Sequence, residues 1–400
     1  MKTMLALPKD SHLFYVGAEG VVLQTKNQKL FALNTFSTYL WSCLDIHPSI
    51  EQAVNDAVQQ FGLSEALASE YALQAIEQWH DVGLLEPQYE VPQQSTSYQV
   101  LTEVSGINPL EPPPSAPSMT VRLLDHTVSI FVDDETALSA IRAVLGHLEV
   151  SIGQAPQPEG RTSAIDVRRG TDSCIVYRNS VPVARFKNPD SIAPTVKSVM
   201  LQEAIDHFDY MFYFHAGVLS NGNALVMLPG AQGAGKSTLT AGLVAAGFIY
   251  YSDEVALVNR NDGLIRPFPI ALCSKAPAWP ILAGLFPEFD TLPSFPRLDG
   301  KVVRYRPPEV DLLDPAYDRA LPVKYLVFPT YNPGATTGLI PLGKVTALQQ
   351  LMTECLGMKN ALTVEMTAWL VEWIEGIDCY ELPNASLTEA VAAVTALVTE

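Results

Sequence analysis

One stretch of the chain, residues 228–238, constrains the fold more than any other. It reads Leu-Pro-Gly-Ala-Gln-Gly-Ala-Gly-Lys-Ser-Thr and fits the pattern G-x-x-x-x-G-K-[ST], with Lys236 and Ser237 at its last two positions. Residues 224–228 before it are apolar, as in a buried strand, and residues 239–246 after it have the apolar spacing of a helix. Because strand, loop and helix follow in the order that this motif requires, the sequence predicts an α/β core around a phosphate-binding loop.

The loop predicts a nucleotide site. Glycines let the backbone curl, so that successive N–H groups point at phosphate oxygens beside the positive end of the following helix. Lys236 is expected to reach the β- and γ-phosphates and Ser237 to ligate Mg²⁺, so the predicted cofactors are ATP and Mg²⁺. A glycine-rich turn without a ligand is the alternative. The residues expected to contact the nucleotide are Gly230, Ala231, Gln232, Gly233, Ala234, Gly235, Lys236, Ser237 and Thr238.

Two acidic residues follow the next apolar run. Residues 248–252 read as a strand, and Asp253 and Glu254 come directly after it. Earlier in the chain, His215 opens another apolar strand with a small-residue step at Ala216 and Gly217. A strand that ends in acids beside a phosphate-binding loop supplies the metal ligand and the base that phosphoryl transfer needs. Asp253 and Glu254, together with Ser237, are therefore the predicted metal ligands.

Composition excludes several classes of function. The 400-residue chain carries a formal net charge of −18, which argues against binding to nucleic acid or to an acidic membrane surface, because both require clustered Lys and Arg. The five cysteines are scattered without a C-x-x-C pair, so neither a zinc site nor a disulfide framework is indicated. No signal pattern and no apolar run long enough to span a membrane is evident, and we expect a cytoplasmic, unanchored protein.

Residues 1–90 are expected to form a small winged-helix-like unit. Two strands, at 13–24 and 29–33, flank a polar turn, and three helices follow. Asn34 and Ser49 are the expected N-caps of the first two, and the third is expected to start near Ser64. This shape is common among DNA-binding domains. The region, however, contains four Lys and no Arg against eleven Asp and Glu, the wrong balance for a phosphate backbone. A peptide is therefore the expected partner.

The first unit resembles the PqqD-like family, small domains that recognise precursor peptides in pathways modifying ribosomally made peptides. The resemblance rests on residues 20–23 (Gly-Val-Val-Leu), on residues 31–34 (Phe-Ala-Leu-Asn), on Trp41 and on residues 82–85 (Val-Gly-Leu-Leu). It implies that this unit is a RiPP recognition element, to whose exposed hairpin edge a leader peptide adds a strand. A packing module without a ligand is the alternative.

Between this unit and the predicted core lie a linker and a lobe. Residues 91–118 are rich in Pro, Ser, Gln and Thr and read as a semi-extended linker. Residues 119–210 read as a mixed α/β lobe with five strands and two helices, and they carry no motif. We interpret this lobe as structural, including its three histidines, His126, His147 and His207.

Residues 210–260 resemble the HPr kinase/phosphorylase family, whose P-loop core is related to that of phosphoenolpyruvate carboxykinase. The match comprises residues 215–218 (His-Ala-Gly-Val), the loop 230–237 and residues 252–254 (Ser-Asp-Glu). The resemblance implies that Asp253 takes the proton from an attacking serine hydroxyl and that His215 lies close to it and tunes it. It also implies that Lys236 holds the β- and γ-phosphates, while Ser237 and Glu254 serve Mg²⁺.

The chain departs from this family after Glu254. The family has Asp at that position, and we find no counterpart of the acidic residue and glycine-rich signature that follow, since residues 264–286 contain no Asp or Glu. This puts HPr as the target, and the reverse phosphorylase reaction, in doubt. Cations occur in this region and after it instead. From these we select Lys275 and Arg304 as candidate clamps for the transferring phosphoryl group.

These inferences combine into one architecture. We expect an α/β P-loop kinase core of the HPr kinase and PEP carboxykinase type at 211–400, the lobe at 119–210, the linker at 91–118 and the peptide-recognition domain at 1–90. The predicted function is ATP-dependent phosphorylation of a serine hydroxyl on a precursor peptide or small protein. A nucleotide-dependent regulatory or chaperone protein and a kinase of a small hydroxylated metabolite are the alternatives. The oligomeric state stays open, a homo-oligomer included.

Overall fold

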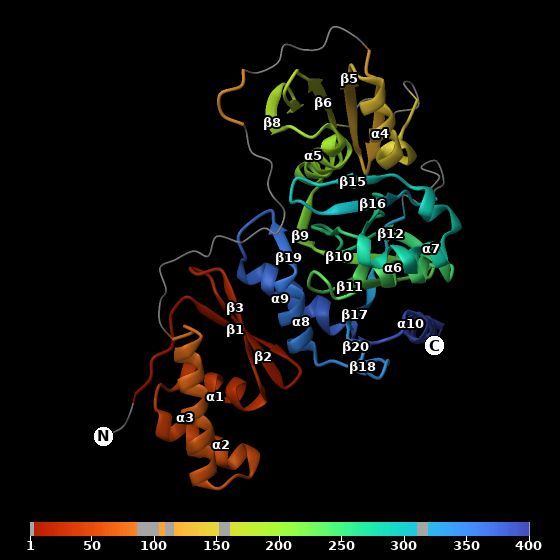
Figure 1. Ribbon diagram of the computed structural model, residues 1–400. Helices are drawn as coiled ribbons and strands as arrows, with labels where there is room; N and C mark the ends of the chain where they lie inside the picture. Colours follow the sequence, from red (N-terminus) through yellow and green to blue (C-terminus); the bar gives the residue numbers. More distant parts are fainter. Residues whose placement is uncertain (1–3, 86–103, 109–115, 152–160, 310–318, 400) are drawn as a thin grey trace. The chain divides into compact units, whose positions relative to one another are not determined.

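The computed structural model describes residues 4–85, 104–108, 116–151, 161–309 and 319–399. The chain is mixed α/β, with several separate sheets (Figure 1). It divides into two compact units, one formed by Met1–Ser95 and Pro341–Tyr380 and the other by Thr96–Ile340 and Glu381–Glu400. Residues 341–380 belong to the predicted catalytic domain at 211–400, but the structure groups them with the N-terminal region. Most of the predicted linker, 91–103 and 109–115, lies outside the described residues.

The sheet of the first unit has three antiparallel strands: β1 (Ser11–Val16), β2 (Glu19–Gln24) and β3 (Lys29–Leu33). The single strand predicted at 13–24 is wrong, because the chain reverses between Val16 and Glu19. Gly17 makes this turn with a φ of 59°, a left-handed conformation that glycine adopts without steric cost. The predicted second turn, between β2 and β3, is confirmed.

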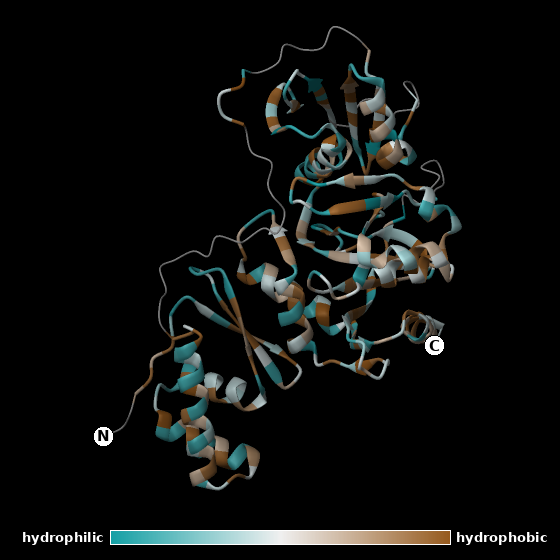
Figure 2. Cartoon of the chain, viewed as in Figure 1, coloured by the Kyte–Doolittle hydropathy of each residue, from teal (hydrophilic) through white to brown (hydrophobic). Residues whose placement is uncertain are grey.

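Three helices follow: α1 (Thr35–Ile46), α2 (Ile50–Phe61) and α3 (Glu65–Asp81). The predicted N-caps Asn34 and Ser49 are confirmed, and Ser64 caps α3: each of these side chains accepts a backbone N–H three residues ahead. Polar and apolar residues divide around α2 and α3, which marks the buried and the solvent-facing sides of each helix (Figure 2). The core between the helices includes Trp41 and Trp79, whose rings meet edge to face at 5.1 Å.

A C-terminal segment completes the first unit: α8 (Lys344–Thr353), β19 (Cys355–Met358) and α9 (Val364–Glu375). Helix α8 packs against β3 and β2, and α9 packs against β1. The Gln28 side chain, in the β2–β3 turn, also accepts the Leu362 N–H at 2.5 Å and donates to the Leu362 carbonyl at 3.2 Å. The small sheet is therefore braced by a segment more than three hundred residues away in the chain.

The second unit begins with the lobe, a five-stranded sheet in the order β4-β5-β6-β7-β8. Its strands are β4 (Met119–Leu123), β5 (His126–Val132), β6 (Arg161–Arg169), β7 (Cys174–Arg178) and β8 (Val181–Phe186). Helix α4 (Glu135–Leu145) leads into a short 3-10 turn, η1 (Gly146–Leu148), and α5 (Ile192–His207) packs on β6 and β7. The strands and helices predicted for 119–210 are confirmed here.

The core sheet of the second unit runs in the order β12-β10-β11-β17-β20-β18. These strands are β10 (Ala216–Ser220), β11 (Leu225–Pro229), β12 (Ile249–Ser252), β17 (Val323–Tyr331), β18 (Ile340–Pro341) and β20 (Asp378–Asn384). Helix α6 (Lys236–Ala245) packs against β10 and against α10 (Leu387–Thr399). Strand β9 (Tyr210–Phe214) pairs with β13 (Ala256–Asn259) in a separate antiparallel ladder.

A third small sheet, β14-β16-β15, follows β13 in the chain. It is built from β14 (Leu272–Lys275), β15 (Ser294–Pro296) and β16 (Val302–Arg306). Between β14 and β15 lie α7 (Trp279–Leu285) and the 3-10 turn η4 (Pro287–Thr291), whose apolar side chains pack against α6. Among the described helices, none is long and apolar enough to cross a membrane.

Candidate functional site

Sheet topology brings the candidate residues to one edge. Strand β10 runs antiparallel to both of its neighbours, β11 and β12. Its first residue, Ala216, lies opposite Pro229 at the end of β11, and Val218 lies opposite Ser252 at the end of β12. His215, the glycine-rich loop and the acids after β12 therefore meet where these strands end, as their places in the sequence predict.

The loop between β11 and α6 is held in a tight curve by its glycines. Gly230, Gly233 and Gly235 have φ angles of 154°, 94° and 92°, which side-chain-bearing residues rarely adopt. The Ala234 N–H donates to the Ala231 carbonyl at 3.1 Å. The Ala234 carbonyl accepts the N–H of Tyr331, at the end of β17, at 3.2 Å. The glycine conformations and these two hydrogen bonds thus hold the loop in a tight curve against the end of β17.

Lys236 is the first residue of α6, and its ammonium points back into the loop. The side chain is buried, and Nζ donates to the carbonyls of Gly230 and Ala231. An ammonium enclosed by a curved backbone at a helix N-terminus places positive charge where a phosphate would lie. The predicted contact of Lys236 with the β- and γ-phosphates stays a prediction.

Asp253 is the most unusual carboxyl group of the site. It is only 1% exposed, and neither oxygen has a hydrogen-bond partner of normal geometry among the described residues. Burial and the negative charge of Glu254 raise the pKa of Asp253 to about 6, although the Ser237 hydroxyl and the charges of Lys236 and His215 act in the opposite direction. Ser237, Lys236 and His215 are thus the groups that favour the ionised form of Asp253.

Glu254 has a different environment, because a lysine from the lobe reaches it. Lys197, on α5, is 4% exposed and donates a short hydrogen bond to the Glu254 carboxylate. Burial raises the pKa of Glu254, but Lys197, with Arg297 and His215 adding to it, outweighs burial and lowers the pKa below its ordinary value. The Ser252 hydroxyl orients this turn by accepting the N–H of Val255 at 3.0 Å.

The donor set suits a divalent cation. Asp253 offers two buried oxygens without a normal hydrogen bond in the described chain, and Ser237 offers a hydroxyl beside them. Glu254 would have to share its carboxylate between a metal and Lys197. Ser237 and Asp253 therefore fit the predicted Mg²⁺ better than Glu254 does. The loop and Lys236 likewise fit the phosphates of a nucleotide.

The two cations selected from the sequence lie in different surroundings. Arg304 donates to the Phe289 carbonyl and to Asp290, both at 3.2 Å, and its guanidinium covers the Trp279 ring at 4.3 Å. These contacts hold Arg304 against α7 and η4, and its predicted role as a phosphoryl clamp stays a prediction. Lys275 ends β14 and lies near Lys301 and Arg297.

Sequence reasoning missed two cations that act on Glu254, Lys197 and Arg297. Lys197 lies in α5, a helix that is buried on nearly all of its faces. A lone lysine in such a helix is a signal in the sequence that could have identified it, because an unpaired lysine is rarely buried. No local pattern identifies Arg297, which directly follows β15. His147, interpreted as structural, bonds the Pro269 carbonyl at 2.7 Å, and burial lowers its pKa to about 4.

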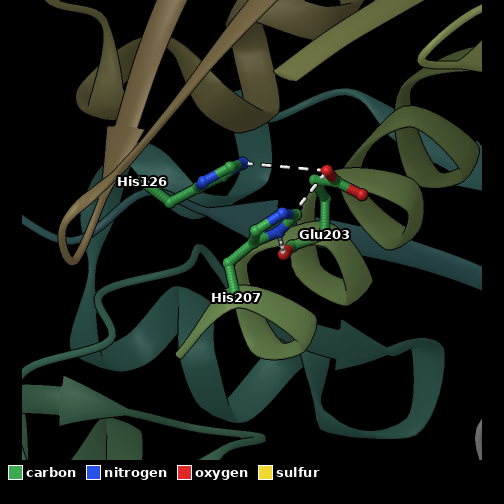
Figure 3. Close-up of side chains that lie close together, drawn as sticks. All are labelled: His126, Glu203 and His207. Atoms are coloured by element: carbon green, nitrogen blue, oxygen red, sulfur yellow. Dashed lines mark hydrogen bonds and ion pairs between the residues drawn. The ribbon is translucent and has the colours of Figure 1, made fainter. Parts of the chain in front are cut away.

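A second cluster of titratable side chains lies inside the lobe: His126 on β5, with Glu203 and His207 on α5 (Figure 3). The His126 Nε2 and His207 Nδ1 atoms lie 3.9 Å and 3.5 Å from the same Glu203 oxygen. The two imidazole rings stack at 4.3 Å with an angle of 12° between their planes. These three ligand types and their spacing raise the question of a metal site.

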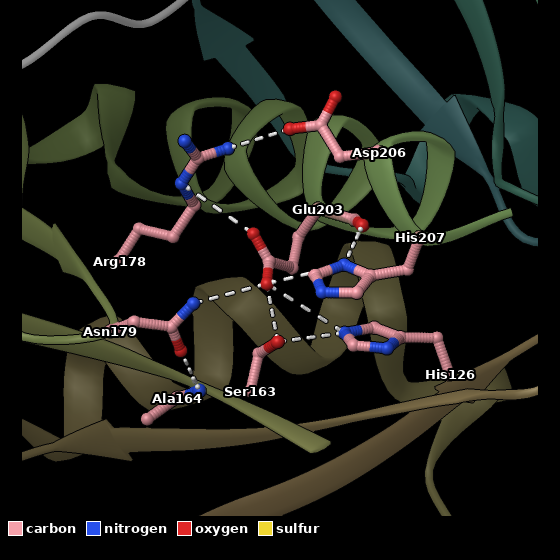
Figure 4. Close-up of polar contacts among 8 residues, drawn as sticks. All are labelled: His126, Ser163, Ala164, Arg178, Asn179, Glu203, Asp206 and His207. Carbon is pink, nitrogen blue, oxygen red and sulfur yellow. Dashed lines mark hydrogen bonds and ion pairs between the residues drawn. The ribbon is translucent and has the colours of Figure 1, made fainter. Parts of the chain in front are cut away.

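The hydrogen bonds around Glu203 argue against a metal (Figure 4). The Ser163 hydroxyl donates to Glu203, so its oxygen accepts from His126 Nε2, which must then carry a proton. His207 Nδ1 meets the Glu203 carbonyl at 2.8 Å and therefore also donates. Arg178 and Asn179 contact the same carboxylate, at 3.5 Å and 3.1 Å. The cluster is a buried carboxylate surrounded by donors, in agreement with the structural interpretation of these histidines.

Comparison with known protein families identifies one region. Residues 19–85 match the family described as Coenzyme PQQ synthesis protein D (PqqD). No curated protein matches the chain. The N-terminal region is a PqqD-like domain. The match ends at residue 85 and does not include the loop at 228–238, so the kinase core stays a prediction.

The PqqD-like domain has the features of a strand-adding module. Strand β3 pairs with β2 on one side, and no strand of the described chain pairs with its other side. Helices pack against this sheet without adding a strand to it: α1 and α8 contact β2 and β3, and α9 contacts β1. An unpaired edge presents main-chain donors and acceptors to an extended peptide. The predicted recognition of a precursor peptide is therefore compatible with this unit.

Proposed function

We propose that this protein is an ATP-dependent kinase that transfers the γ-phosphoryl group to a serine hydroxyl of a precursor peptide. The observation that carries the proposal is the Asp253 carboxylate: it is buried, its pKa is raised to about 6, and it is adjacent to Ser237 and Lys236. A general base needs a pKa near the working pH, whereas a nucleotide switch needs only a metal ligand. This favours a kinase over a regulatory nucleotide-binding protein.

Each residue of the site has a task in this proposal. The loop and Lys236 hold the phosphates, and bound Mg²⁺ would neutralise their charge with Ser237 and Asp253 as its ligands. Asp253 accepts the proton of the acceptor hydroxyl at its free carboxylate oxygen. His215 stabilises the Asp253 charge, and Lys197 holds Glu254 ionised. Catalysis of this kind depends mainly on position and charge, so few groups suffice.

The PqqD-like domain supports a peptide as the acceptor. A leader segment bound at the β3 edge would raise the local concentration of the segment to be modified. Added as a separate peptide, the leader should compete with a leader-bearing substrate and leave turnover of the free core segment unchanged. Equal inhibition of both substrates would remove the recognition role.

Mass spectrometry tests the proposed reaction directly. A serine-containing precursor peptide that the PqqD-like domain binds would be incubated with the protein, ATP and Mg²⁺. A gain of one phosphate on a serine, absent with Asp253→Asn although that variant still binds ATP, supports the proposal. No gain with wild-type protein that binds ATP would favour a regulatory role. Loss of ATP binding in Asp253→Asn as large as in Lys236→Ala would contradict the base assignment.

A further inference from the structure

Three cations gather at one end of the β14-β16-β15 sheet. Lys275 ends β14, opposite Val303, and the β15–β16 hairpin places Arg297 and Lys301 beside that end. The hairpin is closed by the Arg297 N–H, which donates to the Lys301 carbonyl at 2.8 Å, and by the Gly300 N–H, which donates to the Arg297 carbonyl at 3.0 Å. Backbone register, rather than side-chain flexibility, brings the three together.

One carboxylate accompanies these cations. Asp299, the sole acid of the hairpin sequence 296–302, lies 3.3 Å from Arg297 and 3.4 Å from Lys301. Burial, together with the positive charges of Lys301 and Arg297, lowers the pKa of Lys275. Like charges therefore face each other here, on a chain whose net charge is −18. A local excess of positive charge on an acidic protein favours an anionic ligand.

The β14-β16-β15 sheet lies beside the candidate site. Strand β14 contacts α6, and Lys197, the partner of Glu254, has its ammonium 5.4 Å from the centre of the Tyr305 ring on β16. Arg297 lowers the pKa of Glu254, the neighbour of Asp253, and it lies close enough to act on Cys273 as well. Cys273 and Lys275 are two positions apart on β14 and share one face of that strand. Arg297, with Lys275 and Lys301 beside it, therefore lies near Glu254.

We propose that Lys275, Arg297 and Lys301 bind acidic side chains that flank the acceptor serine, so that the substrate class is an acidic peptide. This inference rests on the proposed kinase function and names its substrate. The phosphate-binding loop already supplies Lys236 to the nucleotide, so the second cation group near Glu254 is left to bind the acceptor. An arginine and two lysines that lie together suit carboxylates well.

Peptide binding tests the inference without requiring transfer. Two fluorescent peptides would each contain one serine and differ only in whether the flanking residues are Glu or Gln. Their dissociation constants for the full-length protein would be measured by anisotropy at low and moderate salt. We expect the Glu peptide to bind about tenfold more tightly or better, with a smaller ratio at higher salt. Equal affinity of the two peptides would overturn the inference.

Variants assign the preference to these residues. Lys275→Gln and Lys301→Gln, both mild changes at the sheet end, should each reduce the Glu-over-Gln ratio, and Arg297→Gln should reduce it most. The control Lys187→Gln, at an exposed lysine of the lobe, should leave the ratio unchanged. Two results would contradict acceptor recognition. One is an unchanged Glu-over-Gln affinity ratio in all three variants, and the other is variants that weaken ATP binding and leave this ratio unchanged.

The two proposals fail in distinguishable ways. Lys236→Ala should abolish ATP binding and transfer and yet keep the peptide preference. A wild-type protein that prefers the Glu peptide but transfers no phosphate would refute the kinase function while retaining an acidic-peptide site. A protein that phosphorylates serine with equal preference for both peptides would retain the kinase function and refute the acceptor site.

Discussion

Asp253 and Glu254 are adjacent in the chain, yet the structure moves the pKa values of their carboxyl groups in opposite directions. Glu254 is paired with the ammonium of Lys197, which keeps it ionised. Asp253 is buried beside that negative charge, and its pKa rises to about 6. Two neighbouring acids with divergent pKa values are typical of a site in which one carboxylate handles a proton and the other supplies fixed charge.

The raised pKa predicts that Asp253 costs stability. Because the folded protein holds the proton more tightly than the unfolded chain, stability falls as the pH rises from the ordinary pKa of 3.8 through about 6. Asp253→Asn should therefore raise the free energy of unfolding at pH 8 by on the order of 2 kcal/mol. At pH 5 the difference should shrink, because the wild-type carboxyl is then protonated. Equal thermal stability of the two proteins at both pH values would contradict this environment.

The raised pKa of Asp253 also predicts that the activity decreases at acid pH. A protonated Asp253 cannot accept the proton of the acceptor, so kcat/KM should fall at acid pH. Bound Mg²⁺ would lower the pKa of Asp253 from about 6, so the fall should begin below pH 6. The measurement is initial rate against pH at fixed nucleotide concentration, with nucleotide affinity measured at each pH as the control. A rate that stays constant down to pH 4.5 would show that Asp253 is not the base.

Lys197 and Glu254 should be strongly coupled. Lys197→Met leaves the Glu254 charge buried without its cation and should cost about 3 kcal/mol of stability. The double variant Lys197→Met/Glu254→Gln should recover most of this loss, because no charge is then left unpaired. Chemical denaturation of the wild type, both single variants and the double variant gives the coupling energy. Additive losses would mean that the pair is not formed.

The polar cluster of the lobe should depend on its carboxylate and not on a metal. Glu203→Gln removes the charge that Arg178 and the histidine N–H groups face and should cost about 3 kcal/mol. Asp206→Asn, at a more exposed carboxylate bonded to the same arginine, is the control and should cost much less. Added Zn²⁺ should not raise the melting temperature of the wild type. A zinc-dependent rise that Glu203→Gln abolishes would reveal a metal site instead.

The sequence predicted contacts between elements that are close along the chain, and it did not predict contacts between elements that are far apart. Only two short elements separate His215 from the loop, and two more separate the loop from Asp253, so the alternation of short elements was enough to place them at one sheet edge. The Gly17 turn was missed because residues 13–24 are apolar on both sides of it, and periodicity cannot detect a reversal inside such a run. Lys197 and Arg297 reach the site from other sheets and helices, and their positions depend on tertiary packing that no local pattern encodes. Likewise, the packing of α8 and α9 against the PqqD-like sheet joins distant ends of the chain.

Gly242 couples the candidate site to the C-terminal helix. It lies in α6, the helix that begins at Lys236, and a Cβ added there would come within 2.7 Å of Val391 and 2.9 Å of Leu387 on α10. Gly242→Ala should therefore destabilise the protein by about 1–3 kcal/mol and weaken nucleotide binding, since α6 must shift. Gly284→Ala, in α7, meets no atom within 4 Å and should be neutral or slightly stabilising because alanine favours the helix. Denaturation and nucleotide titration of both variants compare a packed glycine with an open one. Equal effects of the two substitutions would show that α6 and α10 do not pack this closely.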